Sequence, residues 1–183
     1  MKIAWVHQPI LNSQFSNMLK YLNTDIVFQE VPDETSLAIN ITGCPCRCPG
    51  CHSPYLWADS GTPLNAEAID CLMTEHGQGI TCICFMGGDA APHEVANLAA
   101  YIHRNYPQLK VAWYSGRQYI PHNVDKQQFD YIKVGPYIAH LGPLQSDLCN
   151  QHMFKRQTDG SFLDITARFR RSSFLSPTQA TLS

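Results

Sequence analysis

Short apolar runs recur along the chain and predict its strands. They cover residues 25–31, 36–41, 80–86, 110–114 and 131–134. The run 36–41 contains neither glycine nor proline, and its apolar and β-branched content suits a buried strand. The run 80–86 is almost fully apolar, which is typical of a parallel strand covered on both faces. Both runs therefore predict buried strands of a sheet.

Stretches with helical spacing separate several of these strands. Asn65 is suited to cap a helix that ends at Gly77, and Pro92 is suited to open another that ends at Pro107. An earlier helical stripe is predicted near the N-terminus. It consists of Leu11, Phe15, Met18, Leu19 and Leu22.

The order of these elements predicts the fold class. Strands that alternate with helices form parallel sheets with right-handed crossovers. The chain has 183 residues, fewer than the ~250 of a full eight-fold barrel. We therefore expect an α/β fold, an incomplete (partial) TIM-like parallel barrel of about five or six strands. Residues 154–157 and 162–169 add a C-terminal hairpin around the turn at 158–160.

The chain is expected to form one domain with two flanking segments. Residues 18–170 form that domain, and residues 1–17 are an N-terminal extension to which the sequence assigns no role. Residues 171–183 are rich in serine and threonine and are expected to form a disordered tail.

Several predicted strands end in residues that suit a ligand site. A cysteine-rich loop follows residue 41, Gly87-Gly88-Asp89 follows residue 86, and Ser115-Gly116 follows residue 114. Gly135 ends the last of these strands. Ligands of parallel α/β folds bind beyond the carboxyl ends of the strands. The sequence therefore predicts a site at this edge of the sheet.

Composition and charge exclude several function classes. Hydrophobic residues make up 44% of the chain and charged residues 15%, as is typical of a globular protein. The formal net charge of −2 gives no basic footprint for nucleic acid. No apolar run reaches the ~20 residues of a membrane span, and the N-terminus lacks the features of a signal peptide. We expect a cytoplasmic protein that binds neither nucleic acid nor membranes.

The cysteines are concentrated in one loop. Four of the eight, Cys44, Cys46, Cys48 and Cys51, lie within eight residues, which favours a metal site over disulfides. One interpretation is a four-thiolate zinc site, although structural zinc sites usually pair two separated ligand knuckles. The other is a C-x3-C-x2-C motif of Cys44, Cys48 and Cys51, with Cys46 a bystander. Three thiolates would hold a 4Fe–4S cluster and leave its fourth iron open.

A C-x3-C-x2-C motif after a strand resembles the signature of the radical S-adenosylmethionine (SAM) superfamily. Residues 48–57, which run from Cys48-Pro49-Gly50-Cys51 to Trp57, are similar to the anaerobic ribonucleotide reductase activating proteins. Residues 31–34, 131–138 and 150–151 are similar to that family as well. The resemblance implies a 4Fe–4S cluster on the three motif cysteines, with SAM chelated by the fourth iron.

The resemblance also implies residues that contact SAM. Gly87-Gly88-Asp89 resembles the motif that holds the SAM amino group, although a Gly-Gly turn after a strand is common by itself. Gly50 and His52 flank the last motif cysteine and would lie near the adenine. Ser115 would line the SAM pocket, or would only end its strand. Lys133 would face the SAM carboxylate, or would extend to solvent.

The reaction that the resemblance implies is the activation of a glycyl radical enzyme. A reduced flavodoxin or ferredoxin would donate an electron, SAM would be cleaved reductively, and class III anaerobic ribonucleotide reductase would acquire a glycyl radical. No catalytic residue is expected beyond the cluster and SAM. One alternative is a radical SAM enzyme for another glycyl radical enzyme or a small molecule, as in deazapurine or cofactor maturation. The other is a zinc-stabilised binding module without enzymatic activity.

Overall fold

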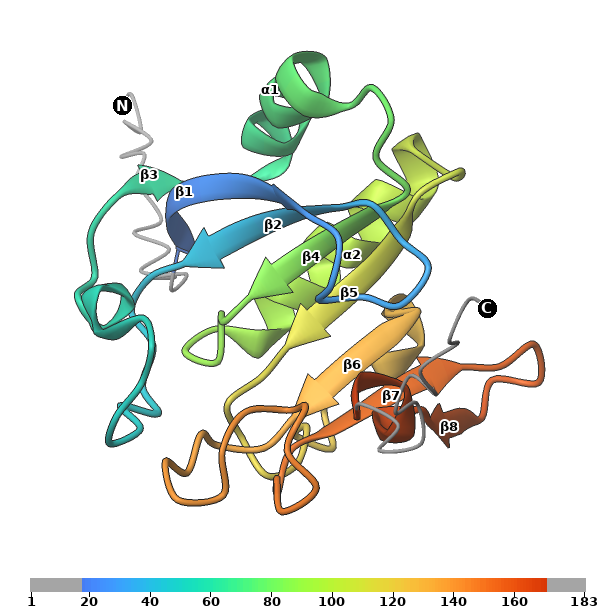
Figure 1. Cartoon of the computed structure of the whole chain (residues 1–183). Helices are drawn as coiled ribbons and strands as arrows, with labels where there is room; N and C mark the ends of the chain where they lie inside the picture. Colours follow the sequence, from blue (N-terminus) through green and yellow to red (C-terminus); the bar gives the residue numbers. More distant parts are fainter. Residues whose placement is uncertain (1–17, 171–183) are drawn as a thin grey trace, which may run out of the picture.

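The fold is built on one mixed sheet with two α-helices (Figure 1). The computed structural model describes residues 18–170. The strands are β1 (Lys20–Val27), β2 (Ser36–Ile41), β3 (Thr62–Pro63), β4 (Cys82–Met86), β5 (Lys110–Tyr114), β6 (Tyr131–Val134), β7 (His152–Arg156) and β8 (Phe162–Asp164). The helices are α1 (Ala66–His76) and α2 (Pro92–Asn105), with 3-10 helices η1 (Pro54–Trp57), η2 (Lys126–Gln128) and η3 (Thr166–Phe169).

The sheet has a parallel centre and antiparallel flanks. Its strand order is β3-β1-β2-β4-β5-β6-β7-β8. The strands β2, β4, β5 and β6 run parallel to one another, whereas β1, β3, β7 and β8 join in antiparallel pairs. The edge strands β3 and β8 do not pair with each other, so the sheet is open. The carboxyl ends of the four parallel strands therefore meet at one edge.

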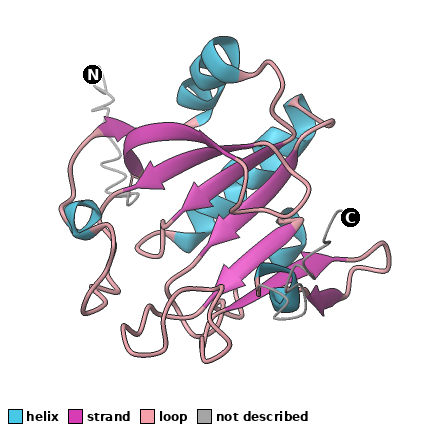
Figure 2. Cartoon of the chain, in the orientation of Figure 1, coloured by secondary structure: helices cyan, strands magenta, loops and turns pink. Residues whose placement is uncertain are grey.

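Both α-helices contribute to a core on one face of the sheet (Figure 2). Alternate residues of β4 and β5 enter this core, among them the fully buried Phe85 and Trp113. Helix α1 begins at the predicted cap, where the Asn65 side chain accepts a hydrogen bond from the backbone N–H of Ala68. Helix α2 begins at Pro92, which needs no N–H partner at this position.

The intervening residues of the same strands form a second, smaller core on the opposite face. Cys82 and Cys84 of β4 point into it, together with Met153 of β7. Loops rather than α-helices complete this core, with Val31 from the β1–β2 connection and Leu144 from the β6–β7 connection. The alternation explains why β4 is apolar on both faces.

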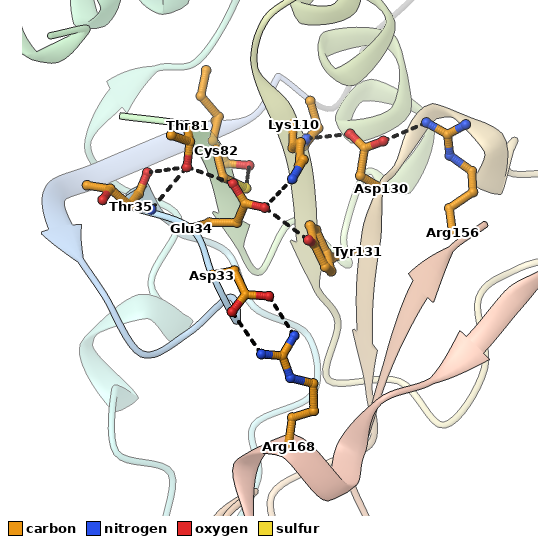
Figure 3. A network of polar contacts seen from close by, with 12 residues as sticks. Asp33, Glu34, Thr35, Thr81, Cys82, Lys110, Asp130, Tyr131, Arg156 and Arg168 are labelled. Atoms are coloured by element: carbon orange, nitrogen blue, oxygen red, sulfur yellow. Dashed lines mark hydrogen bonds and ion pairs between the residues drawn. The ribbon is translucent and has the colours of Figure 1, made fainter. Parts of the chain in front are cut away.

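A polar network lies at the amino-terminal ends of the parallel strands (Figure 3). Glu34 precedes β2, and its side chain is almost fully buried. Its carboxylate accepts hydrogen bonds from the hydroxyls of Thr81 at 2.7 Å and Tyr131 at 3.0 Å, and pairs with Lys110. Because these residues precede or begin β4, β5 and β6, the network joins four strands at the edge opposite the cysteine loop.

Most of the predicted elements are confirmed. The strands 36–41, 110–114 and 131–134 and the starts of both α-helices coincide with the structure. The C-terminal hairpin is present as β7 and β8, but its second strand ends at Asp164, and residues 166–169 form η3 instead. The predicted strand at 25–31 is displaced, because β1 covers Lys20–Val27.

The predicted N-terminal helix and the predicted barrel both need correction. The helix over 11–22 is wrong for its last part, which belongs to β1 because Tyr21 pairs with β2 and β3. Its earlier part lies outside the described residues, as do the expected extension 1–17 and tail 171–183. The fold is mixed α/β, and its sheet consists of the six strands β1–β6 and the two hairpin strands β7 and β8. A partial barrel is not confirmed, since only the four central strands are parallel and the sheet is not closed.

Candidate iron–sulfur and cofactor site

A cavity of about 300 Å³ lies at the carboxyl ends of the parallel strands. Four strands border it, through Ile41 of β2, Met86 of β4, Tyr114 of β5 and Lys133 of β6. The cysteine loop that follows β2 covers this edge and contributes all four of its thiols to the lining. The structure therefore brings the cysteines and the other strand ends to one site.

Backbone hydrogen bonds within the cysteine loop close its base. The N–H of Gly43 donates to the carbonyl of Ala58, and the N–H of Cys44 to that of Leu56, each at 3.0 Å. A tight turn follows within the motif, where the N–H of Cys51 donates to the carbonyl of Cys48 at 3.0 Å. These contacts place Cys44, Cys48 and Cys51 on the same rim of the cavity.

The donor set suits a four-iron cluster. Cys44, Cys48 and Cys51 line one cavity, and each thiolate of such a cluster binds a different iron. Trp57 also lines the cavity, and its indole N–H is buried without an acceptor among the described residues. A bound group would supply one.

Cys46 points toward the strand ends beneath the loop. Its Sγ lies 3.8 Å from Oδ2 of Asp89. Burial, together with the negative charge of Asp89, raises the pKa of the Cys46 thiol to about 12. In the metal-free loop Cys46 is therefore a neutral thiol at pH 7.

Asp89 joins the ends of β4 and β5. Asp89 is 1% exposed. Its carboxylate accepts hydrogen bonds from Ser115 Oγ at 2.6 Å and from the Gly116 N–H at 2.9 Å. The Arg117 guanidinium donates to the backbone carbonyl of Asp89 at 2.9 Å. Asp89 and Ser115 both line the cavity, yet each uses its side chain to fix the other strand end. Their clearest role in the structure is positioning.

The two adjacent glycines face different surroundings. Gly87 lines the cavity, and its turn is held by hydrogen bonds with Tyr114 and Trp113. Gly88 has a φ of 88°, and a Cβ at this position would lie 2.5 Å from Cγ2 of Val95 in α2. Gly88 therefore permits close packing of the turn against the helix and is not among the residues that line the cavity.

Lys133 provides a positive charge inside the cavity. Of the described residues that line it, Lys133 is the only lysine or arginine. Its Nζ lies 5.5 Å from the centre of the Tyr114 ring and donates no hydrogen bond to another described residue. Burial lowers the pKa of Lys133 to about 8, so it is largely protonated at pH 7. A half-buried amine that forms no ion pair with a described carboxylate suits an anionic ligand.

Gly50 and His52 lie on the outer rim of the site. His52 lines the cavity, and its ring centre lies 4.8 Å from that of Tyr137. Gly50 has a φ of 76° and permits the turn between the last two motif cysteines. It is not among the lining residues, although its backbone lies close to Tyr137 and Ala139.

The structure adds a residue that the sequence did not single out as part of the site. Gln151 is 6% exposed, lines the cavity and donates from Nε2 to the carbonyl of Gly135 at 3.0 Å. The neighbouring Asn150 donates to the carbonyl of Pro136 at 3.0 Å. Together they hold the turn after β6. The only sequence signal was the resemblance of 150–151 to the activating proteins, because β7 meets β6 through tertiary pairing.

Comparison with known proteins supports an iron–sulfur assignment. No curated protein matches the chain, and no solved structure does either. Within the part of the chain that the structure describes, no helix is long and apolar enough to cross a membrane. Residues 35–140, more than half of the chain, match the family described as "4Fe-4S single cluster domain". This match covers the cysteine loop and the strand ends around the cavity, and the chain belongs to that family of iron–sulfur proteins.

Proposed function

We propose that this protein is a radical SAM activating enzyme that generates a glycyl radical on class III anaerobic ribonucleotide reductase. One observation carries the proposal: the C-x3-C-x2-C cysteines and Lys133 line the same cavity at the carboxyl ends of the parallel strands. A cluster with three thiolates and an unpartnered cation beside it suit a ligand that chelates iron and carries a carboxylate.

Cys44, Cys48 and Cys51 would hold the cluster. When bound, a 4Fe–4S cluster with one open iron supplies the electron that cleaves SAM reductively. Cys46 is left over from this set, and the second buried core keeps Cys82 and Cys84 away from the cavity.

The protein's own residues would bind and orient SAM. The Lys133 ammonium would pair with the carboxylate of SAM, because it is the only lysine or arginine among the described residues that line the cavity. The Gly87 turn provides backbone close to the ligand, and Asp89 holds that turn to the end of β5 through Ser115 and Gly116. The Leu56 and Trp57 side chains line the loop side of the cavity and would exclude water from it.

The open sheet supports a macromolecular substrate. Buried side chains, among them Tyr131, Leu144 and Met153, fill the second core. This core therefore leaves no room for a substrate. A radical made in this site would act on a group that reaches the cavity from outside, such as the glycine loop of a partner enzyme. A reduced flavodoxin or ferredoxin would serve as the electron donor.

The test is anaerobic reconstitution with iron and sulfide, followed by reduction and addition of SAM. We expect 5′-deoxyadenosine, and a glycyl radical signal in electron paramagnetic resonance (EPR) when the class III reductase is added. Cys48→Ala should abolish both signals, whereas Cys71→Ala, which removes an exposed thiol of α1, should abolish neither.

Three other results would contradict the proposal in distinct ways. If 5′-deoxyadenosine forms but the reductase acquires no radical, the enzyme acts on another substrate. If a cluster forms but SAM is not cleaved, the protein is an iron–sulfur protein of another kind. If zinc binds and iron does not, the four-thiolate interpretation replaces the cluster.

A further inference from the structure

The cysteine loop carries one thiol more than a three-thiolate cluster needs. Cys46 lies between two motif cysteines, is only partly exposed and lines the same cavity as they do. By contrast, Cys71 lies exposed on α1, and Cys82 and Cys84 are sealed in the second core. Cys46 is therefore the one non-motif thiol, among those that the structure describes, that shares the cavity.

The Cys46 side chain enters the part of the cavity formed by β4 and β5. Its Sγ lies 3.8 Å from Oδ2 of Asp89. A Cβ on Gly116 would lie 2.9 Å from the same Sγ and 3.2 Å from the Cβ of Cys46, so the glycine leaves room for this thiol. The Gly87 turn, which Asp89 holds to the end of β5, is the backbone proposed to lie close to SAM. Cys46 and SAM would therefore compete for one place.

A thiol in this place would meet an iron that needs a ligand. Three thiolates satisfy three irons of a 4Fe–4S cluster, and thiolates are among the preferred ligands of the fourth. Cys46 follows Cys44 by two residues, so its attachment to the loop gives it a high effective concentration at the cluster. It would bind that iron whenever no other ligand does.

We propose that Cys46 is an exchangeable fourth ligand, which binds the open iron of the cluster in the absence of SAM and leaves it when SAM binds. The inference rests on the proposed function and adds a device that protects the resting cluster. The exchange transfers no electron. The iron–sulfur bond to Cys46 breaks, and bonds to the amino nitrogen and carboxylate oxygen of SAM form. The SAM ammonium releases one proton, and the Cys46 thiolate takes up one.

The test compares the reconstituted wild-type protein with Cys46→Ala and with Cys46→Ser, which keeps nearly the same size. The first readout is the yield of the 3Fe–4S signal in EPR after mild oxidation without SAM. This signal reports loss of the fourth iron. We expect several times more of it from both variants than from wild type. Cys71→Ala is the matched control for removal of a thiol and should behave as wild type.

The second readout is the dissociation constant of SAM, measured by equilibrium dialysis on the oxidised holoprotein. Without a competing thiolate, we expect SAM to bind Cys46→Ala about tenfold more tightly than wild type. Equal 3Fe–4S yields and equal SAM affinities in variant and wild type would make Cys46 a bystander and overturn the inference alone. A wild-type cluster that never binds SAM, or no cluster in wild type, would overturn the proposed function as well.

Circular dichroism and gel filtration of the metal-free variants separate these results from misfolding. If Cys46→Ala fails to fold, Cys46→Ser carries the comparison, because a serine oxygen is a weaker ligand for iron than a thiolate.

Discussion

At the scale of single residues, Gly88 allows the turn after β4 to pack closely against helix α2. It has a positive φ and faces Val95 at a distance too short for a Cβ. Gly79 has a similar φ of 81° and nothing within 4 Å of a Cβ, so it is a matched control. We expect Gly79→Ala to lower the free energy of unfolding by about 1 kcal/mol and Gly88→Ala by about 1–3 kcal/mol more.

Urea unfolding of both variants under argon measures this difference. Gly88→Ala combined with Val95→Ala should recover part of the loss, because the second change removes the methyl group in the way. Equal costs for Gly88→Ala and Gly79→Ala would contradict the assignment of Gly88 to helix packing.

In the proposed function, the half-buried Lys133 binds SAM rather than stabilises the fold. Lys133→Met should leave the cluster absorbance unchanged and weaken SAM binding about 10- to 100-fold, through loss of a charge-assisted contact with a carboxylate. Because burial lowers the pKa of Lys133 to about 8, its charge is lost as the pH rises past that value. The SAM dissociation constant of the wild-type holoprotein, relative to that of Lys133→Met, should therefore rise between pH 7 and pH 9, since the proton that the SAM amino group releases affects both proteins alike. A ratio that does not change with pH would argue against the pairing.

At the scale of the elements, Glu34 ties four strands together (Figure 3). Glu34→Ala should lower the free energy of unfolding by about 2–4 kcal/mol, because it removes a buried carboxylate with several partners and leaves the Tyr131 hydroxyl unsatisfied. Lys110→Met should cost less, about 1–2 kcal/mol, because the Lys110 side chain is 47% exposed and Glu34, although only 3% exposed, keeps its two hydroxyl donors.

Urea unfolding compares the Glu34 and Lys110 variants. Cluster absorbance should survive both of them, since the network lies at the opposite end of the sheet from the cysteine loop. A larger loss for Lys110→Met than for Glu34→Ala would show that the ion pair, rather than the hydroxyl contacts, holds the strands.

At the scale of the whole molecule, the sheet and the cysteine loop are separable. The sheet is stabilised by two cores, whereas the described base of the loop depends on few backbone contacts, such as Gly43 to Ala58 and Cys44 to Leu56. Removal of the cluster by a chelator should therefore abolish the amide protection of residues 43–58 and preserve that of β4 and β5. Hydrogen exchange measures both. Equal loss across the sheet would mean that the metal site holds the fold together.

The sequence by itself determined the parts of this protein that depend on local patterns. The strands at 36–41 and 110–114 and the cap at Asn65 follow from residue type and period, which act over a few neighbours. The motif spacing likewise indicated an iron–sulfur site before the structure placed its cysteines around one cavity.

Tertiary structure decided what local patterns leave open. By spacing alone, residues 19–22 suit either a helix or a strand. Pairing with β2 and β3 places residues 20–22 in β1, and residue 19 directly precedes that strand. The two-residue strand β3 is too short to leave a pattern. The different surroundings of Gly87 and Gly88, and the approach of Cys46 to Asp89, depend on residues distant in the chain. The physical reason is that the period of apolar residues determines which face of an element is buried. Which residues contact that face is determined only when the strands of the sheet pair with one another.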